Sequence, residues 1–201
     1  STSIRVVGFG SNLSTNFRVY SVNSVGQSAS PVTTASAVLG TTVPQAPTIG
    51  TATSNNTYIS VTYTANATGG KAINTYTATS SPGSLTGSIS SGSIIVYSVV
   101  HNTAYTFTVT ATNANGTSAA SSASNTAYGV NIGAVSNVTS TSTSSSITLN
   151  FTKGTNSTST RGYLNGNLDG TTAGTSYLFA GLSASTSYSL GLTPTATVNG
   201  T

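Results

Sequence analysis

The sequence predicts an all-β protein that consists of several small β-sandwiches joined in tandem. Short segments alternate apolar and polar residues with a period of two, as half-buried strands do. Turn-forming residues separate these segments at regular intervals. No segment has the 3.6-residue periodicity of an amphipathic helix, and β-branched residues, which favour strands, are abundant.

The clearest strand is predicted over residues 105–112. Apolar side chains alternate there with threonines, so one face is expected to pack into a core and the other to meet water. The apolar residues are Tyr105, Phe107, Val109 and Ala111. The next segment, Asn113-Ala-Asn115-Gly116-Thr117, contains an Asn-Gly pair that favours a tight reversal, so a second strand is expected to return beside the first.

The remaining strands are assigned by the same alternation between turn signals. In chain order they are expected at residues 4–9, 17–22, a Ser-, Thr- and Ala-rich segment ending near Leu39, 59–63, 73–78, 94–99, 147–151, around Tyr163, 177–182 and 188–192. Ser81-Pro82-Gly83 is expected to form a turn. Pro44-Gln-Ala-Pro47 cannot be helical and is expected to be an extended connection between two sandwiches.

Internal repeats divide the chain into three units. Gly26 aligns with Gly116 at a spacing of ninety residues, and Tyr188 aligns with Tyr105 at a spacing of eighty-three, with matching residues around each pair. We therefore predict the C-terminal part of a first unit at residues 1–43, a complete unit at 44–129 and a third unit, lacking its last strand, at 130–201.

Three segments of the middle unit carry a specific resemblance. They are Ala46-Pro47-Thr48-Ile49, residues 73–83 (INTYTATSSPG) and residues 102–120 (NTAYTFTVTATNANGTSAA). In these segments the chain resembles the tandem fibronectin type III repeats of microbial and phage surface and virion proteins. The resemblance spans the middle unit, is weaker over 130–201 and is partial over 1–43. It implies immunoglobulin-like, Greek-key β-sandwiches.

The resemblance also implies a tyrosine corner, in which a phenol hydroxyl bonds to backbone a few residues upstream. Tyr105 and Tyr188 have the matching spacing, whereas Thr15 stands at that place in the first copy. The buried tryptophan that is usual in these repeats is missing, and Tyr63 and Phe151 stand at the matching strand positions.

Charged residues make up only 3% of the chain, as five Lys or Arg and one acidic residue. The cations are scattered singly, which argues against nucleic-acid binding because that needs clustered positive charge; they are Arg5, Arg18, Lys71, Lys153 and Arg161. A threonine-rich surface without charge lacks the usual protection of strand edges, so we expect a protein held in an assembly. The chain has no Cys for disulfides, and apolar runs such as 94–97 are too short to insert in a membrane.

Catalysis is not expected. The chain has one histidine, His101, and one carboxylate side chain, Asp169, and they fall in different predicted units. A nucleophilic triad needs a histidine oriented by a carboxylate, and a glycosidase needs two carboxylates. We therefore predict no enzyme, no catalytic or cofactor-binding residue and no cofactor.

Residues 165–170 (NGNLDG) have the oxygen-ligand spacing of a calcium loop, but the twelfth position is Ser176 where a glutamate is expected. Asn-Gly and Asp-Gly are also hairpin-turn pairs, so a turn is favoured and no metal site is predicted. Arg161-Gly162-Tyr163 is the nearest approach to the Arg-Gly-Asp of adhesive fibronectin type III repeats and lacks the acid.

Two kinds of surface feature remain as hypotheses. Asn-x-Ser/Thr glycosylation patterns occur at Asn12, Asn55, Asn66, Asn115, Asn137, Asn150, Asn156 and Asn199, and most are expected from composition alone. Tyr20, Tyr58 and Tyr128 are expected to be exposed, where they are able to stack on sugars or partner proteins.

The function expected from these observations is a structural and binding repeat of a virion protein, used as capsid decoration, fibre or tail-associated spacer. The alternatives are a repeat of a bacterial surface adhesin or extracellular filament, and an accessory module of a secreted polysaccharide-degrading enzyme. The expected partners are other structural subunits of a homo- or hetero-oligomeric particle or filament, and host-surface glycans. The expected location is the virion surface or the extracellular space.

Overall fold

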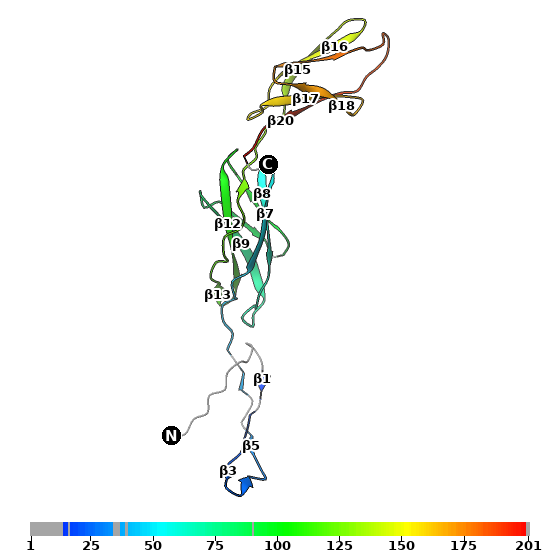
Figure 1. Cartoon of the computed structure of the whole chain (residues 1–201). Coiled ribbons are helices and arrows are strands. Elements are labelled where there is room, and N and C mark those ends of the chain that lie inside the picture. The colour runs from blue at the N-terminus through cyan, green and yellow to red at the C-terminus, as the bar shows by residue number, and fades with distance from the viewer. Residues whose placement is uncertain (1–13, 16, 34–36, 39, 90, 200–201) are drawn as a thin grey trace.

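The computed structural model describes residues 14–15, 17–33, 37–38, 40–89 and 91–199. Within these ranges every regular element is a β-strand, which confirms the all-β prediction. Figure 1 shows a sandwich in the middle of the chain, a second one towards the C-terminus and, before them, one N-terminal hairpin made of short, nested strand pairs. We call the two bodies the middle sandwich (β7 to β14) and the C-terminal sandwich (β15 to β20).

The middle sandwich has two antiparallel sheets, with strand orders β11-β8-β7 and β10-β9-β12-β13; β14 also pairs with β12. Its strands are β7 (Thr48–Asn55), β8 (Tyr58–Thr64), β9 (Ile73–Ser81), β10 (Thr86–Ile89), β11 (Ile94–Tyr97), β12 (Ala104–Asn113), β13 (Gly116–Thr117) and β14 (Ala127–Tyr128). The inward side chains of both sheets form one core, whose fully buried members include Ile59, Val61, Ile94, Val96 and Phe107. Each such side chain stabilises the fold by about 1.5–3 kcal/mol.

Strand β12 forms the centre of its sheet and has the predicted alternation. Tyr105, Phe107, Val109 and Ala111 are 3%, 1%, 0% and 2% exposed, whereas the intervening threonines are half-buried. The strand pairs with β9, where Val109 faces Ala78. After the turn, β13 returns for only two residues, with Asn113 facing Gly116.

Beyond β13 the chain stays beside β12 through three serines, which we call the serine ladder: Ser118, Ser121 and Ser124. Each serine donates its N–H to a carbonyl of β12 and accepts the N–H of the same β12 residue on its Oγ. The bonds join Ser118 to Ala111 (2.8 and 3.0 Å), Ser121 to Val109 (2.9 and 2.9 Å) and Ser124 to Phe107 (2.9 and 3.0 Å). The hydroxyl oxygens thus take the place of the carbonyls that a regular strand would present.

The C-terminal sandwich repeats this arrangement with the orders β15-β16-β19 and β18-β17-β20. Its strands are β15 (Ser136–Ser142), β16 (Ser146–Thr152), β17 (Ser159–Leu164), β18 (Asn167–Thr172), β19 (Ser176–Ala180) and β20 (Leu190–Thr195). Leu149, Phe151, Tyr177 and Phe179 are the buried residues of its smaller core.

The two cores have side chains of different size at one equivalent position. In the C-terminal sandwich Tyr177 faces Leu149, at the register position where Ile94 faces Val61 in the middle sandwich. A tyrosine ring therefore stands in place of the smaller isoleucine side chain. A glycine, Gly162, lies beneath it, and a Cβ there would come within 2.5 Å of the Tyr177 ring. The larger ring is therefore accommodated by a smaller neighbour, as dense cores require.

Both predicted tyrosine corners are present. The Val100 N–H donates to the Tyr105 hydroxyl oxygen (3.1 Å), and the Ser183 N–H donates to the Tyr188 hydroxyl oxygen (2.9 Å). Both bonds span five residues, and the same corner therefore closes each sandwich. Of the residues expected in place of the missing tryptophan, Phe151 is 5% exposed and Tyr63 is half-buried, with its ring 4.4 Å from that of Tyr76.

The short N-terminal strands repeat the pairing of the middle sandwich at the ninety-residue spacing. They are β1 (Ser14–Thr15) with β6 (Ala37–Val38), β2 (Arg18–Val19) with β5 (Val32–Thr33), and β3 (Val22–Asn23) with β4 (Gly26–Gln27). Asn23 faces Gly26 as Asn113 faces Gly116. The Ser28 N–H donates to the Ser21 carbonyl at 2.8 Å, the counterpart of the first rung of the serine ladder.

Several predicted strands differ from the observed ones. The strand expected at 17–22 is divided into β2 and β3, the one ending near Leu39 is divided into β5 and β6, and the one at 188–192 begins only at Leu190, because Tyr188 is engaged in the corner. The strand expected at 4–9 lies outside the described residues. The prediction also missed β7, β10, β15 and β18, which are edge strands rich in Ser, Thr and Gly without regular apolar alternation.

Candidate functional site: the joints before and after the middle sandwich

The connection before the middle sandwich is held by amide side chains. The Thr42 carbonyl accepts one hydrogen bond from Asn113 Nδ2 and one from Asn115 Nδ2, both of 2.9 Å. The Thr42 N–H donates to the Gly69 carbonyl at 2.8 Å. Asn113 is 3% exposed, so its amide is fixed by its surroundings. The turn after β12 thus holds the connection in place. Residues 40–47 have no regular structure, so the prediction that Pro44 to Pro47 is not helical is confirmed.

The connection after the middle sandwich, residues 129–133, is bound by the turn between β7 and β8. Asn56 Nδ2 donates to the Ile132 carbonyl (3.3 Å), and the Ile132 N–H donates to Asn56 Oδ1 (2.9 Å). The Thr57 N–H donates to the Val130 carbonyl at 2.7 Å. The Asn56 amide thus bonds to both the N–H and the carbonyl of Ile132, as the backbone of a neighbouring strand would. The connection therefore continues the pairing of the sheet that contains β7 and β8.

The C-terminal sandwich also forms hydrogen bonds to the connection at residues 129–133. Asn156 Nδ2 donates to the Asn131 carbonyl at 2.7 Å, and the Gly133 N–H donates to the Thr155 carbonyl at 3.0 Å. In addition, the Asn199 N–H donates to Asn102 Oδ1 at 2.9 Å, which links the two sandwiches directly. Amide-to-backbone hydrogen bonds depend little on salt, so the orientation set by these contacts is expected to persist across ionic strengths.

The two candidate acid–base groups lie in different sandwiches and have separate structural contacts. His101 Nδ1 accepts the N–H of Asn131 at 3.3 Å, in the joint. Asp169 Oδ2 accepts the hydroxyl of Tyr177 at 2.9 Å. Burial of the phenol, and then its bond to Asp169, raise the pKa of Tyr177 above its ordinary value. The structure does not bring His101 and Asp169 together.

The segment with calcium-loop spacing is part of a hairpin. Asn165 and Gly166 have φ angles of 50° and 83° and form the turn between β17 and β18, as type I′ turns require. Asp169 and Gly170 do not form a turn, because they lie inside β18, where Gly170 faces Gly162. The Asn-Gly part of the turn prediction is therefore confirmed, and the Asp-Gly part is wrong. Within the described ranges no three His, Cys, Asp or Glu side chains gather as a metal site requires.

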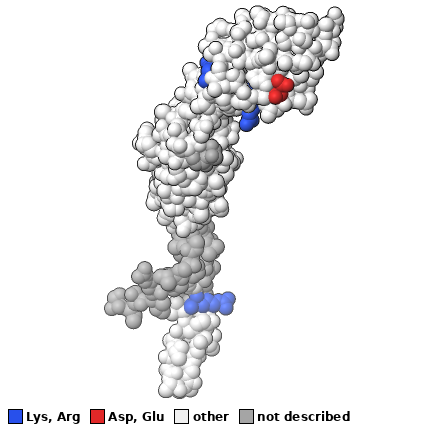
Figure 2. Space-filling view, turned by 45° about the horizontal axis from the view of Figure 1, so that its top comes forward, with Lys and Arg blue, Asp and Glu red and all other residues white. Residues whose placement is uncertain are grey.

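Positive charge is dispersed over the surface. The face in Figure 2 carries isolated blue patches and one red patch. Lys153 is bound within its own sandwich, with Nζ donating to the Thr158 and Ala173 carbonyls at 3.1 Å each. Arg5 lies outside the described residues.

No helix in the described part of the chain is long and apolar enough to cross a membrane.

Most of the asparagines in glycosylation patterns have structural hydrogen bonds. The Nδ2 atoms of Asn55, Asn66, Asn115, Asn137 and Asn156 all donate to other protein atoms. Asn150 and Asn199 are exposed, and Asn12 lies outside the described residues. Glycosylation of these patterns stays a hypothesis.

The exposed tyrosines differ in part from those expected. Tyr20 is 37% exposed, but Tyr58 and Tyr128 are half-buried. Tyr97, which was not predicted to be exposed, is 62% exposed and lies beside Tyr58, with ring centroids 5.8 Å apart. Tyr97 ends β11 on its outward face, so the alternation over residues 94–97 could have predicted that it is exposed.

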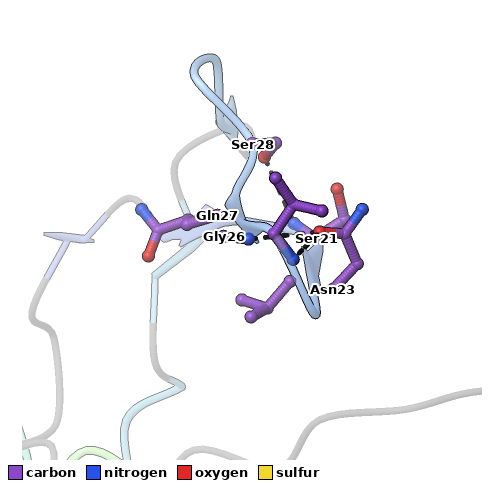
Figure 3. Close-up of a pocket in the computed structure, with 7 residues that line it drawn as sticks. Ser21, Asn23, Gly26, Gln27 and Ser28 are labelled. Carbon is purple, nitrogen blue, oxygen red and sulfur yellow. Dashed lines mark hydrogen bonds between the residues drawn. The ribbon is translucent and has the colours of Figure 1, made fainter.

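A depression in the N-terminal hairpin is formed by the turn between β3 and β4 (Figure 3). Asn23 Oδ1 accepts the N–H groups of Val25 and Gly26 at 2.9 and 3.2 Å, which is a local turn contact. The same contact joins Asn115 to Asn113 in the middle sandwich at 2.8 Å. The polar groups of this depression therefore serve the turn itself.

No protein-family model matches the sequence, and no curated protein is significantly similar to it. Among solved structures the chain is similar to chicken CNTN1 domains FN1–FN3, with a TM-score of 0.44, 16% identity, and coverage of 89% of this chain and 69% of that one. It is also similar to domains d3–d4 of the rat CD45 extracellular region, with a TM-score of 0.44, 15% identity, and coverage of 64% and 70%. A third is the central fibronectin-III array of RIM-binding protein, with a TM-score of 0.33, 14% identity, and coverage of 80% and 64%. The sandwich assignment itself rests on the strand order and register described above.

The contacts that hold the chain between sandwiches were not predicted from the sequence. Asn56, Asn102 and Asn131 lie in turns or connections, where asparagine is common for local reasons. Their partners are as many as 97 residues away, so no local pattern shows them. The serine ladder did have a signal, because Ser118, Ser121 and Ser124 recur at every third position.

Proposed function

We propose that this chain is a non-enzymatic structural and binding array of fibronectin type III-like sandwiches, serving as capsid decoration, fibre or tail-associated spacer of a virus particle. We take residues 1–43, 44–129 and 130–201 as its units. The proposed partners are other structural subunits of the particle, with host-surface glycans as a second class.

The observation that carries this proposal is the joint at residues 129–133. Asn56 and Thr57 of the middle sandwich and Asn156 of the C-terminal sandwich all bond to this one connection. A connection that is hydrogen-bonded to the sandwich on each side keeps the two sandwiches at a fixed spacing, whereas a free linker allows many spacings. Fixed spacing is what a spacer or fibre requires.

The surface composition supports a place within an assembly. Only 3% of the residues are charged, and the edge strand β15 is exposed along its whole length without a lysine or a glutamate. Such edges tend to pair with other chains. Neighbouring subunits of a particle would cover them.

The test is to locate the protein. Antibodies raised against the full chain, with mass spectrometry of purified particles, are expected to find it in stoichiometric amounts on virions, and an abundant host cytoplasmic protein serves as the purity control. Detection only in bacterial cell-wall fractions would instead favour an adhesin or filament. Detection only in culture fluid, on a polypeptide with a carboxylate-rich catalytic domain, would favour an accessory module of a polysaccharide-degrading enzyme.

A further inference from the structure

The middle sandwich has a depression beside a pair of tyrosines that come from its two sheets. Tyr63 of β8 and Tyr76 of β9 both line the depression, with their ring centroids 4.4 Å apart and their ring planes at 36°. Further lining residues lie at the end of β8 and before β11: Thr62, Ala65, Ser91 and Ser93. The volume of about 500 Å³ lies within the roughly 300–1,000 Å³ that is typical of ligand-binding clefts.

The phenol hydroxyls of these two tyrosines have no use within the described part of the chain. Tyr76 is 7% exposed and Tyr63 is half-buried, yet neither hydroxyl forms a hydrogen bond to another described residue. The corner tyrosine differs, because the Tyr105 hydroxyl accepts the N–H of Val100. Burial, and then the neighbouring Tyr76, raise the pKa of Tyr63, as expected for two phenols that lie close together. A buried polar group without a protein partner is expected to bind water or a ligand.

The chemistry of the lining favours an uncharged ligand that is rich in hydroxyl groups. The lining residues present hydroxyls, aromatic rings and apolar groups but no charge. A charged ligand would lose part of its hydration there without an ionic partner. A hydroxyl donates and accepts hydrogen bonds, so it matches the hydroxyls of a sugar, and an aromatic ring offers an apolar surface to the C–H groups of a sugar ring.

The C-terminal sandwich has different side chains at the equivalent positions. Phe151 stands in place of Tyr63, and Thr160 stands in place of Tyr76, since it faces Pro194 as Tyr76 faces Ala111. Phenylalanine has no hydroxyl, and Thr160 is 0% exposed, so no ligand reaches its side chain. The pair of phenol hydroxyls is therefore specific to the middle sandwich and is not needed to build a sandwich of this kind.

We propose that the depression binds one neutral hexose unit of a glycan, with the phenol hydroxyls of Tyr63 and Tyr76 hydrogen-bonded to sugar hydroxyls and the Tyr63 ring packed against sugar C–H groups. The inference rests on the proposed function, because it gives a site to the glycans that are proposed there as a second class of partner. The site itself is argued from the middle sandwich and does not depend on where the protein is found.

The experiment applies the full chain to a glycan microarray that holds neutral oligosaccharides ending in glucose, galactose or mannose, together with sialylated and sulfated ones. At least one neutral oligosaccharide is expected to bind, and its Kd is then measured by NMR titration. Tyr63→Phe and Tyr76→Phe are each expected to weaken binding about tenfold, as the loss of one hydrogen bond would. Because these hydroxyls bond to no described residue, both variants are expected to keep the melting temperature of the parent chain.

The matched control is Tyr97→Phe, which removes a phenol hydroxyl from a 62% exposed tyrosine outside the depression. Its Kd is expected to equal that of the parent chain. Binding of no neutral oligosaccharide, or of sialylated and sulfated ones alone, would overturn the proposal. An unchanged Kd in both Tyr63→Phe and Tyr76→Phe would overturn it too, because the sugar would then bind elsewhere. The virion localisation test is independent of this result, so failure of the glycan site and failure of the proposed function are distinguishable.

Discussion

Tyr105 shows how one side chain serves both packing and hydrogen bonding. Its ring fills the end of the middle core at 3% exposure, and its hydroxyl oxygen accepts the N–H of Val100. Thr108 lies on the same strand but on the opposite face, where it is half-buried. The two positions therefore test the assignment of the faces of β12.

We expect Tyr105→Ala to lower the free energy of unfolding of the middle sandwich by about 3–5 kcal/mol, since it leaves a cavity and removes the corner bond. Thr108→Ala is expected to cost less than half as much. Chemical denaturation of the full chain, followed by tyrosine fluorescence and circular dichroism, measures both. Equal losses for the two variants would mean that the faces are assigned wrongly.

The raised pKa of Tyr177 predicts that the free energy of unfolding depends on pH. Burial, and then the bond to Asp169, raise its pKa in the folded chain above the ordinary 10.0. Above that pH the unfolded chain has lost the phenol proton while the folded chain still holds it, so the free energy of unfolding falls as the pH rises through the folded pKa. Below about pH 10 this contribution is fully present.

The measurement is a pH series of denaturation curves on the full chain and on Tyr177→Phe. The variant is expected to lose stability less steeply above pH 10.0. Tyr163→Phe, on the neighbouring strand β17, is the control and should follow the parent chain. A Tyr177→Phe curve as steep as that of the parent chain would contradict the assignment.

Among the elements, the serine ladder replaces a regular last strand. A regular strand offers β12 a partner at every second residue, whereas the ladder offers one at every third and supplies the missing acceptors from hydroxyls. Each hydroxyl also donates to the next carbonyl, as Ser121 does to Ser122 at 2.7 Å. The side chain is therefore fixed in the position from which it accepts.

Replacing Ser121 by alanine is expected to lower the free energy of unfolding by about 1–3 kcal/mol, because the Val109 N–H loses its acceptor in a partly buried place. Ser122→Ala, one residue away and exposed, is expected to change it by less than about 0.5 kcal/mol. Thermal unfolding of the full chain compares the two. Faster amide exchange at Val109 in Ser121→Ala alone would identify the lost bond, and equal exchange in both variants would refute the ladder.

The sequence predicts the strands whose apolar residues alternate and misses the edge strands β7, β10, β15 and β18, which lack that alternation, for a physical reason. β8, β12 and β16 have one face in the core, so burial imposes alternation that a reader can see. β15 is exposed throughout and carries only Ser, Thr, Asn and Val. Its residues show no alternation of apolar and polar side chains, and its pairing with β16 determines the outcome.

The same distinction holds for the candidate site. The tyrosine corners were predictable because the bond spans five residues, within the reach of a local pattern. The joint was not, since Asn56 and Ile132 are 76 residues apart. Short polar residues in turns have many local uses, and only the completed fold shows which of them join two sandwiches.

At the scale of the whole molecule, the chain joins its bodies with amides in place of ions. Asn56 and Thr57 on one side and Asn156 on the other donate hydrogen bonds to the connection at 129–133, and His101 Nδ1 accepts one from it. With one carboxylate in the chain, ion pairs were scarcely available for this purpose. Asparagine supplies a donor and an acceptor from one short side chain and pairs with backbone in both directions.

This joint makes a prediction that is specific to one side chain. Asn56→Ala removes both bonds to Ile132 but leaves the sheets intact, so it is expected to loosen the orientation of the sandwiches without unfolding them. Asn55→Ala is the matched control, because the Asn55 amide donates to Thr53 and Ser60, which both lie in the middle sandwich.

Since the chain has no Cys, single spin labels can be placed through Thr86→Cys and Thr171→Cys, at exposed positions in the two sandwiches. Pulsed electron resonance is expected to give a narrow distribution of label distances in the parent chain and in Asn55→Ala, and a distinctly broader one in Asn56→Ala. An equally narrow distribution in Asn56→Ala would show that the remaining contacts, among them Thr57 with Val130, fix the joint without it. Broad distributions in all three chains would show that the bonds do not hold the sandwiches in one orientation, and would remove the main support for a spacer.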